Sequence, residues 1–147
     1  MRGCLIDTNV VLRLANSNDL LHTRAVEAVR KLREQQLVPC ISPQVVAEFW
    51  NVATRPQSAN GLGWSPQDVL NYVFELLESV ALLHDTANGF YLWLFLVAIL
   101  GVQGKQVHDA RLVATMLAHG VQHLLTFNAQ DFARYTPLIT VWDAGTV

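Results

Sequence analysis

The sequence has little charge. Only 15% of its 147 residues are charged, and the net charge is −2. A protein that coats nucleic acid with a broad basic surface normally carries a strong basic excess, so the composition argues against that class. The hydrophobic share is 52%, which is enough for one compact domain with a sizeable buried core. We therefore expect a single domain over residues 1–147.

Cysteine is also scarce, and no long apolar span is present. Cys4 and Cys40 lie in short apolar stretches without the Cys/His spacing of a zinc site. Free cysteine packs as a small hydrophobe, so we expect two buried thiols in a reducing compartment. The uncharged residues 90–102 are too few to cross a bilayer. Asp7 comes too early for a secretory leader. These features predict a cytoplasmic protein with no membrane partner.

Lysine and arginine are missing from the middle of the chain. Between Pro56 and Gly104 there are four acidic residues and no basic one, so this segment carries −4 and the rest of the chain +2. A polyanion should therefore approach the first and last thirds of the chain. Most of these basic side chains are expected on solvated helix faces. The candidates for phosphate contacts are Arg13, Arg55, Lys105, Arg111 and Arg134.

Short apolar segments alternate with helical patterns along the whole chain. Strands are predicted at residues 4–6, 37–41, 80–83, 123–127 and 139–142. Thr8 and Asn9 can cap a first helix, and the Ser-Pro pairs 42–43 and 65–66 predict two more helices with serine caps. Further helices are predicted over residues 22–35, 86–100, 107–119 and 128–134. This alternation predicts a three-layer α/β/α fold around a central parallel five-stranded sheet.

Four acidic residues stand where the predicted strands end or where neighbouring helices begin. Asp7 ends the first strand, and Asp131 follows the fourth. Glu48 lies in the first turns after the second strand, and Asp109 opens the helix that leads into the fourth. Ligands of open α/β sheets bind beyond the carboxyl ends of the strands. We therefore expect these four carboxylates to converge on one edge of the sheet.

A cluster of carboxylates needs a cation, because like charges repel and raise one another's pKa. Oxygen ligands suit Mg²⁺ or Mn²⁺, which can activate water against a phosphodiester. Taken singly, Asp7, Asp109 and Asp131 could instead be ordinary acids at helix N-termini. Glu48 is harder to explain in that way, because it lies within an apolar helix face where an unpaired carboxylate is costly.

Four sequence segments resemble the motifs of PIN-domain nucleases, in the same order and with similar spacing. They are residues 5–11 (LIDTNVV), 45–52 (VVAEFWNV), 108–114 (HDARLVA) and 125–132 (LTFNAQDF). The resemblance covers essentially the whole chain. Within that superfamily, the small size and the motif variants resemble the VapC toxins of bacterial toxin–antitoxin pairs.

The resemblance implies a Mg²⁺- or Mn²⁺-dependent endoribonuclease that cleaves structured RNA, forms a homodimer and is inhibited by a VapB-type antitoxin. Asp7, Glu48 and Asp109 match the three metal-binding acids, and Asp131 matches the more variable fourth. The positions matching residues that orient these acids are Thr8, Asn9, Thr126 and Asn128. His108 precedes Asp109, and we favour a capping or packing role for it over general-base catalysis.

Three other functions remain open at this point. A PIN nuclease could process RNA without an antitoxin, and only a neighbouring antitoxin gene would separate that case. An inactive PIN-like module that binds RNA or protein would typically have lost one of the acids, and all four are present. A phosphorylated receiver domain also has aspartates at strand ends, but the positions of Glu48 and Asp131 argue against it.

Residues 91–100 form an apolar segment with no polar face beyond Tyr91. A helix that is apolar all round is expected to be buried on more than one side. Either this helix belongs to an unusually deep core, or it packs partly on a second subunit or on an antitoxin. We favour the interface.

Overall fold

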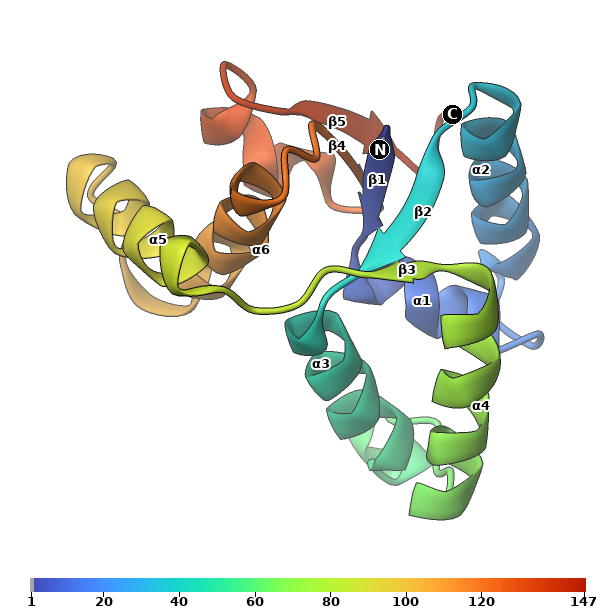
Figure 1. Ribbon diagram of the computed structural model, residues 1–147. Helices are drawn as coiled ribbons and strands as arrows, with labels where there is room; N and C mark the ends of the chain where they lie inside the picture. Colours follow the sequence, from blue (N-terminus) through green and yellow to red (C-terminus); the bar gives the residue numbers. More distant parts are fainter. Residues whose placement is uncertain (1) are drawn as a thin grey trace.

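The computed structural model describes residues 2–147 and has a five-stranded parallel sheet at its centre (Figure 1). Its strands are β1 (Gly3–Ile6), β2 (Val38–Ile41), β3 (Ala81–Leu82), β4 (His123–Thr126) and β5 (Thr140–Asp143). The strand order is β3-β2-β1-β4-β5, and every neighbouring pair is parallel. The predicted α/β/α fold is confirmed, although the edge strand β3 is shorter than the predicted residues 80–83.

Six α-helices surround the sheet. They are α1 (Thr8–Ala15), α2 (His22–Glu34), α3 (Pro43–Thr54), α4 (Pro66–Ser79), α5 (Ala87–Ile99) and α6 (Val107–Ala118). As predicted, Ser42 and Ser65 cap α3 and α4, accepting from backbone N–H groups of the first turn, and a proline follows each serine.

One predicted detail of the helices is wrong. Thr8 and Asn9 do not cap α1, because the helix already begins at Thr8 and the preceding Asp7 is its cap. The short helix predicted at residues 128–134 is present as the 3₁₀-helix η3 (Ala129–Tyr135). Two further 3₁₀ segments, η1 (Gln57–Ala59) and η2 (Gly104–Gln106), lie in the connections before α4 and α6.

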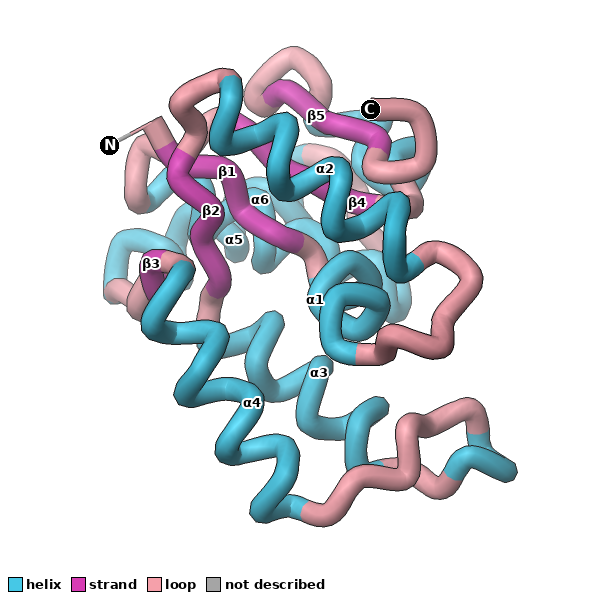
Figure 2. The backbone as a smooth tube through the Cα atoms, turned by 90° about the vertical axis from the view of Figure 1, so that its right-hand side faces the viewer, coloured by secondary structure: helices cyan, strands magenta, loops and turns pink. Residues whose placement is uncertain are grey.

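The helices form two layers and one projecting pair. Helices α1 and α2 cover one face of the sheet, and α5 and α6 lie on the other (Figures 1 and 2). Helices α3 and α4 pack against each other and extend beyond the carboxyl end of β2. The chain crosses from one side of the sheet to the other between β3 and β4, so β1 and β4 become neighbours at the sheet's reversal point.

The core lies at the central strands. Cys4 and Cys40 are fully buried on the adjacent strands β1 and β2, and both are free thiols, as predicted. Burial is the main cause of the raised pKa of both thiols, which keeps them protonated and unreactive. Among residues 2–147, no helix is both long and apolar enough to cross a membrane.

Helix α5 differs from the other helices because none of its 13 residues is buried. It packs on α6, and Trp93 Nε1 donates a 2.8 Å hydrogen bond to the carbonyl of Val107. Much of its apolar surface is open, with Phe95 59% and Ile99 79% exposed. The deep-core explanation of residues 91–100 is therefore wrong.

Candidate active site

Asp7 is the most tightly held of the predicted acids. It follows β1, and its backbone N–H donates to the carbonyl of Leu125 at 2.9 Å, so the backbone continues the pairing with β4. Its Oδ1 accepts from the Thr8 N–H at 2.8 Å, and its Oδ2 accepts from the Thr126 hydroxyl at 2.8 Å. Burial raises the pKa of Asp7, and these hydrogen bonds oppose the rise only in part.

Thr126 is the centre of a small polar network beneath Asp7. Its side chain is fully buried. Besides donating to Asp7, its hydroxyl oxygen accepts from Asn9 Nδ2 at 3.2 Å and from the Asn128 backbone N–H at 3.0 Å. Asn9 also reaches Asp7 Oδ2 at 3.3 Å, and its Oδ1 accepts from the Phe127 N–H at 3.0 Å. The structure thus brings Asn9 and Thr126 to Asp7, whereas Asn128 joins the network through its backbone.

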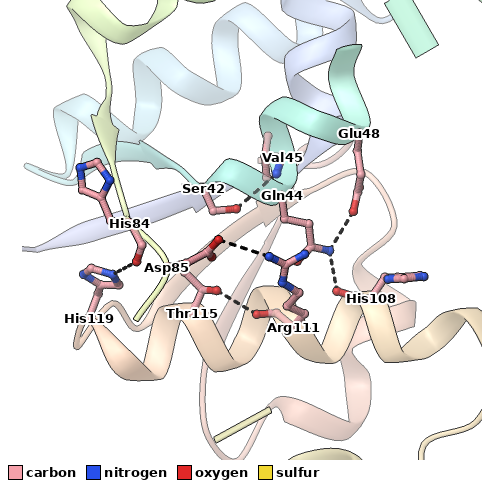
Figure 3. Close-up of polar contacts among 10 residues, drawn as sticks. All are labelled: Ser42, Gln44, Val45, Glu48, His84, Asp85, His108, Arg111, Thr115 and His119. Carbon is pink, nitrogen blue, oxygen red and sulfur yellow. Dashed lines mark hydrogen bonds and ion pairs between the residues drawn. The ribbon is translucent and has the colours of Figure 1, made fainter. Parts of the chain in front are cut away.

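Glu48 is half-buried and paired rather than isolated in an apolar face. Thr8 Oγ1 donates to its Oε2 at 2.9 Å, and Gln44 Nε2 donates to its Oε1 at 2.8 Å (Figure 3). Thr8 therefore contacts Asp7 through its backbone and Glu48 through its side chain. These two hydrogen bonds provide partners for a carboxylate that the sequence placed within an apolar helix face.

Sequence reasoning missed Gln44. Its side chain is 6% exposed, and its amide also donates to the carbonyl of His108 at 2.8 Å, which ties α3 to the start of α6 (Figure 3). The signal was the spacing of four residues between Gln44 and Glu48, which places both on one face of a helix. A glutamine so close to the Ser42 cap was easily taken for an ordinary first-turn residue.

The remaining two acids open onto a cleft of about 580 Å³. The cleft is lined by Glu48, Lys105, Gln106, His108, Asp109 and Asp131. The pKa of Asp109 is raised to about 6, mainly by burial and then by the negative charges of Asp7, Asp131 and Glu48. The charge of His108 acts in the opposite direction. All four acids from separate segments therefore act on one another electrostatically.

The donor set fits a hard divalent cation by its chemistry. In the part of the chain that the structure describes, no three acid, histidine or cysteine side chains gather closely enough to hold one metal ion. The four carboxylates share one electrostatic field without converging on a single point. Mg²⁺ typically takes one or two carboxylates and completes its shell with water and phosphate oxygens. Such a partly hydrated ion suits oxygen donors spread around an open cleft.

The five basic candidates fall into different places. Lys105 lines the acidic cleft, and Arg134 donates at 2.7 Å to Gln106, which also lines it. Arg13 donates to the carbonyl of Asn9 at 3.0 Å, with its guanidinium over the Phe127 ring.

The other two candidates lie outside the cleft lining. Arg111 pairs with Asp85 at 3.4 Å, further along α6 (Figure 3). Arg55 follows the C-terminal end of α3, about 10 Å along that helix from Glu48.

The sequence matches the family model of the PIN domain over residues 4–136. No curated protein matches it. The fold is similar to VapBC2 from Rickettsia felis, bound to a DNA fragment from its promoter, with a TM-score of 0.68, 16% identity and coverage of 96% of this chain and 99% of that chain. It is also similar to DNA-bound VapBC from Salmonella typhimurium, with a TM-score of 0.68, 17% identity and coverage of 98% and 99%.

A third similar structure is VapC20 from Mycobacterium tuberculosis, a toxin that cleaves the sarcin–ricin loop. Its TM-score is 0.58 and its identity 22%, with 82% of this chain and 86% of that chain covered. At these identities the likeness shows a common fold.

Proposed function

Because this chain belongs to the PIN-domain family, we propose that it is a metal-dependent endoribonuclease and the toxin of a VapBC-type toxin–antitoxin pair. The observation that carries the proposal is the cleft around Asp109. Its carboxyl group has a pKa of about 6 because burial and three further carboxylates disfavour its charge. An arrangement of like charges that is costly to the apoprotein is typical of a site built for a cation and a reaction.

In this proposal Asp7, Glu48 and Asp109 hold Mg²⁺ or Mn²⁺, with Asp131 as the fourth acid. A bound divalent ion would supply a nucleophilic water at neutral pH and a counter-charge for the phosphate. The protein keeps the donors oriented: Thr126 and Asn9 position Asp7, and Thr8 and Gln44 position Glu48. Lys105, at the cleft, is placed to meet the phosphate backbone of RNA.

The similar solved structures support the toxin assignment over an RNA-processing nuclease without an antitoxin. Two of them are VapBC complexes, and the third is a toxin that cleaves an RNA loop. The inactive PIN-like module is the less favoured alternative, because all four acids are present and the charges of three of them act on Asp109.

Manganese-dependent RNA cleavage by the wild type and by Asp7→Asn tests the proposed reaction. Asn at this buried position keeps the size of the side chain while removing the charge. We expect cleavage by the wild type with Mn²⁺, none with EDTA, and a loss of more than about 100-fold in Asp7→Asn. Equal rates for the two proteins would overturn the mechanism.

The open face of α5 is the proposed homodimer surface. Beyond Phe90, five large apolar side chains of this segment are exposed: Tyr91, Leu94, Phe95, Ile99 and Leu100. At roughly 100 Å² each they offer about 500 Å², more than half of the roughly 800 Å² that each partner contributes to a standard interface. The helix carries no charge, so a second copy meets it without like-charge repulsion.

Light scattering on Phe95→Lys tests the dimer. Leu96 is a poor position for such a test, because its side chain packs against the core. Phe95 is exposed, so lysine there should leave the monomer folded and convert a dimeric wild type into a monomer. Phe74→Lys, on α4 and equally exposed at 59%, is the matched control. A wild type that is monomeric, or a Phe95→Lys protein that stays dimeric, would remove this assignment.

A further inference from the structure

A second cavity lies beside α6, outside the acidic cleft. It has a volume of about 370 Å³ and is enclosed by the loop before α5, the first turns of α5 and one face of α6. Its main side chains are Asp85, Phe90, Trp93, Arg111 and Thr115. The acidic cleft uses none of them.

This cavity combines flat apolar walls with a polar edge. Phe90 and Trp93 lie with their ring centroids 6.1 Å apart, and Phe90 is 54% exposed. The carboxylate of Asp85 and the guanidinium of Arg111 stand 3.4 Å apart and are both about half-exposed (Figure 3). An acceptor beside a donor matches the polar edge of a nucleobase, and an aromatic ring matches its face.

Hydrogen bonds within the fold hold the segments that carry Asp85 and Arg111 in place. The Thr115 hydroxyl donates to the carbonyl of Arg111 at 3.0 Å, within α6. His119 Nε2 lies 2.7 Å from the carbonyl of His84, which fastens the loop carrying Asp85 to the end of α6 (Figure 3). The edge of the cavity is therefore part of the packed fold on both sides.

The cavity and the acidic cleft lie along the same helix. His108 lines the cleft, and Arg111 and Thr115 line the cavity one and two turns further along α6 (Figure 3). The seven-residue step from His108 to Thr115 spans about 10 Å along the helix. One RNA strand could therefore occupy both, with a phosphate at the acids and a neighbouring base in the cavity.

We propose that this cavity is a nucleobase subsite for a single-stranded or looped RNA substrate, in which a base stacks on Phe90 and hydrogen-bonds to Asp85 and Arg111. The inference rests on the proposed function for its substrate class. The negative charge of Asp85 makes a phosphate a poor occupant, and the aromatic walls favour a planar ring. Stacking of a base on an aromatic side chain is worth about 1–3 kcal/mol, or roughly 5- to 150-fold in affinity.

The test is RNA binding without catalysis. Fluorescence anisotropy in EDTA would compare a labelled 12-nucleotide single-stranded RNA of mixed sequence with an abasic strand of the same length. We expect the wild type to bind the RNA at least about 5-fold more tightly than the abasic strand. Phe90→Ala should lose most of that difference and keep its affinity for the abasic strand. Phe74→Ala, at a similarly exposed phenylalanine on α4, is the control and should bind both strands as the wild type does.

A second variant separates base recognition from simple charge. Asp85→Ala removes a negative charge, so binding through phosphates alone predicts tighter binding of both strands. A base subsite predicts weaker binding of the RNA and equal or tighter binding of the abasic strand. Equal affinity of the wild type for the two strands, an unchanged Phe90→Ala, or the same loss in Phe74→Ala would overturn the subsite.

These outcomes are independent of the proposed nuclease. Cleavage in Mn²⁺ together with base-independent binding in EDTA would remove the subsite and leave the nuclease. Base-dependent binding by a protein that does not cleave RNA would remove the nuclease and leave the subsite.

Discussion

The four carboxylates of the proposed site form two pairs that are held in different ways. Asp7 and Glu48 are fixed by neutral hydrogen-bond donors: Thr126 and Asn9 for the first, Thr8 and Gln44 for the second. Asp109 has a pKa raised by burial and by the charges of the other acids, and Asp131 lines the cleft as an exposed side chain.

The difference separates orientation from ionisation. The donors that point at Asp7 and Glu48 fix where the carboxylate oxygens lie, and at Asp7 they oppose part of the pKa rise that burial causes. The negative charges of the other three acids raise the pKa of Asp109, so removing any one of them should lower that pKa. Variants of the donors should therefore impair the geometry of the site, while variants of the free acids should shift its pKa values.

Among variants of the supporting donors, the largest effect is expected from Thr126→Val. Valine fits the space of threonine but removes the hydroxyl that donates to Asp7, and it leaves two N–H groups without their acceptor. We expect RNA cleavage to fall by about 10- to 100-fold and the free energy of unfolding to fall by about 1–3 kcal/mol. Urea unfolding and cleavage assays measure both.

Thr136→Val is the matched control for this change. Thr136 is exposed, and its hydroxyl donates only to a local carbonyl, that of Ala133, at 2.9 Å. The control should change neither quantity appreciably. A Thr126→Val protein with wild-type cleavage would show that Asp7 does not depend on its donors.

A smaller loss, of about 10-fold in cleavage, is expected from Gln44→Leu. Leucine fills the buried position but removes the donor to Glu48 Oε1 and to the carbonyl of His108. Thr8 still holds the other oxygen of Glu48, so the damage should be partial. Gln67→Leu is the control, because Gln67 makes the same four-residue contact, to Asn71 at 3.0 Å, on an exposed face of α4. Equal losses in both variants would contradict a positioning role for Gln44.

The sequence located the acids of the proposed site better than the side chains that support them. Asp7, Asp109 and Asp131 could be placed because strand ends and helix starts are marked locally, by apolar runs and by first-turn acids. The role of Gln44 could not, because it depends on a contact with His108, 64 positions away. Local patterns carry no information on such pairs.

Helix α5 is a second case in which the local sequence pattern did not identify a packing partner. Its uniform apolarity was visible in the sequence, and it predicted burial on more than one side. The sequence did not show whether this chain itself would cover the helix. In the structure α5 packs on α6 at the outside of the domain, so part of its apolar surface is not covered by the rest of the chain. The absence of a polar stripe identified an unusual helix but could not locate what packs on it.

For Asp109, the prediction concerns stability and pH in the metal-free protein. Its pKa is about 6 in the folded chain, above its ordinary value of 3.8. Between these values the folded state holds a proton that the unfolded state has lost, so stability rises as the pH falls from 7 towards 4. We expect Tm in EDTA to be higher by a few degrees at pH 5 than at pH 7, at about 2–4 °C per kcal/mol for a chain of this size.

Asp109→Asn should remove this part of the pH dependence, because an amide does not titrate. Its Tm should be higher than that of the wild type at pH 7 and closer to it at pH 5. Calorimetry at the two pH values measures the change. A variant with the wild-type slope would show that Asp109 is not the group responsible.

The smallest effect is expected from Asp131→Asn on the pKa of Asp109. Removing one of the three negative charges that raise this pKa should lower it below about 6, while burial and the charges of Asp7 and Glu48 keep it above its ordinary value. A carboxyl NMR titration in EDTA would follow the shift. Asp68→Asn, at an exposed first-turn acid of α4, is the control and should leave the titration unchanged. If the pKa of Asp109 is the same in Asp131→Asn as in the wild type, the charge of Asp131 does not act on Asp109. Asp131 would then not belong to the electrostatic cluster.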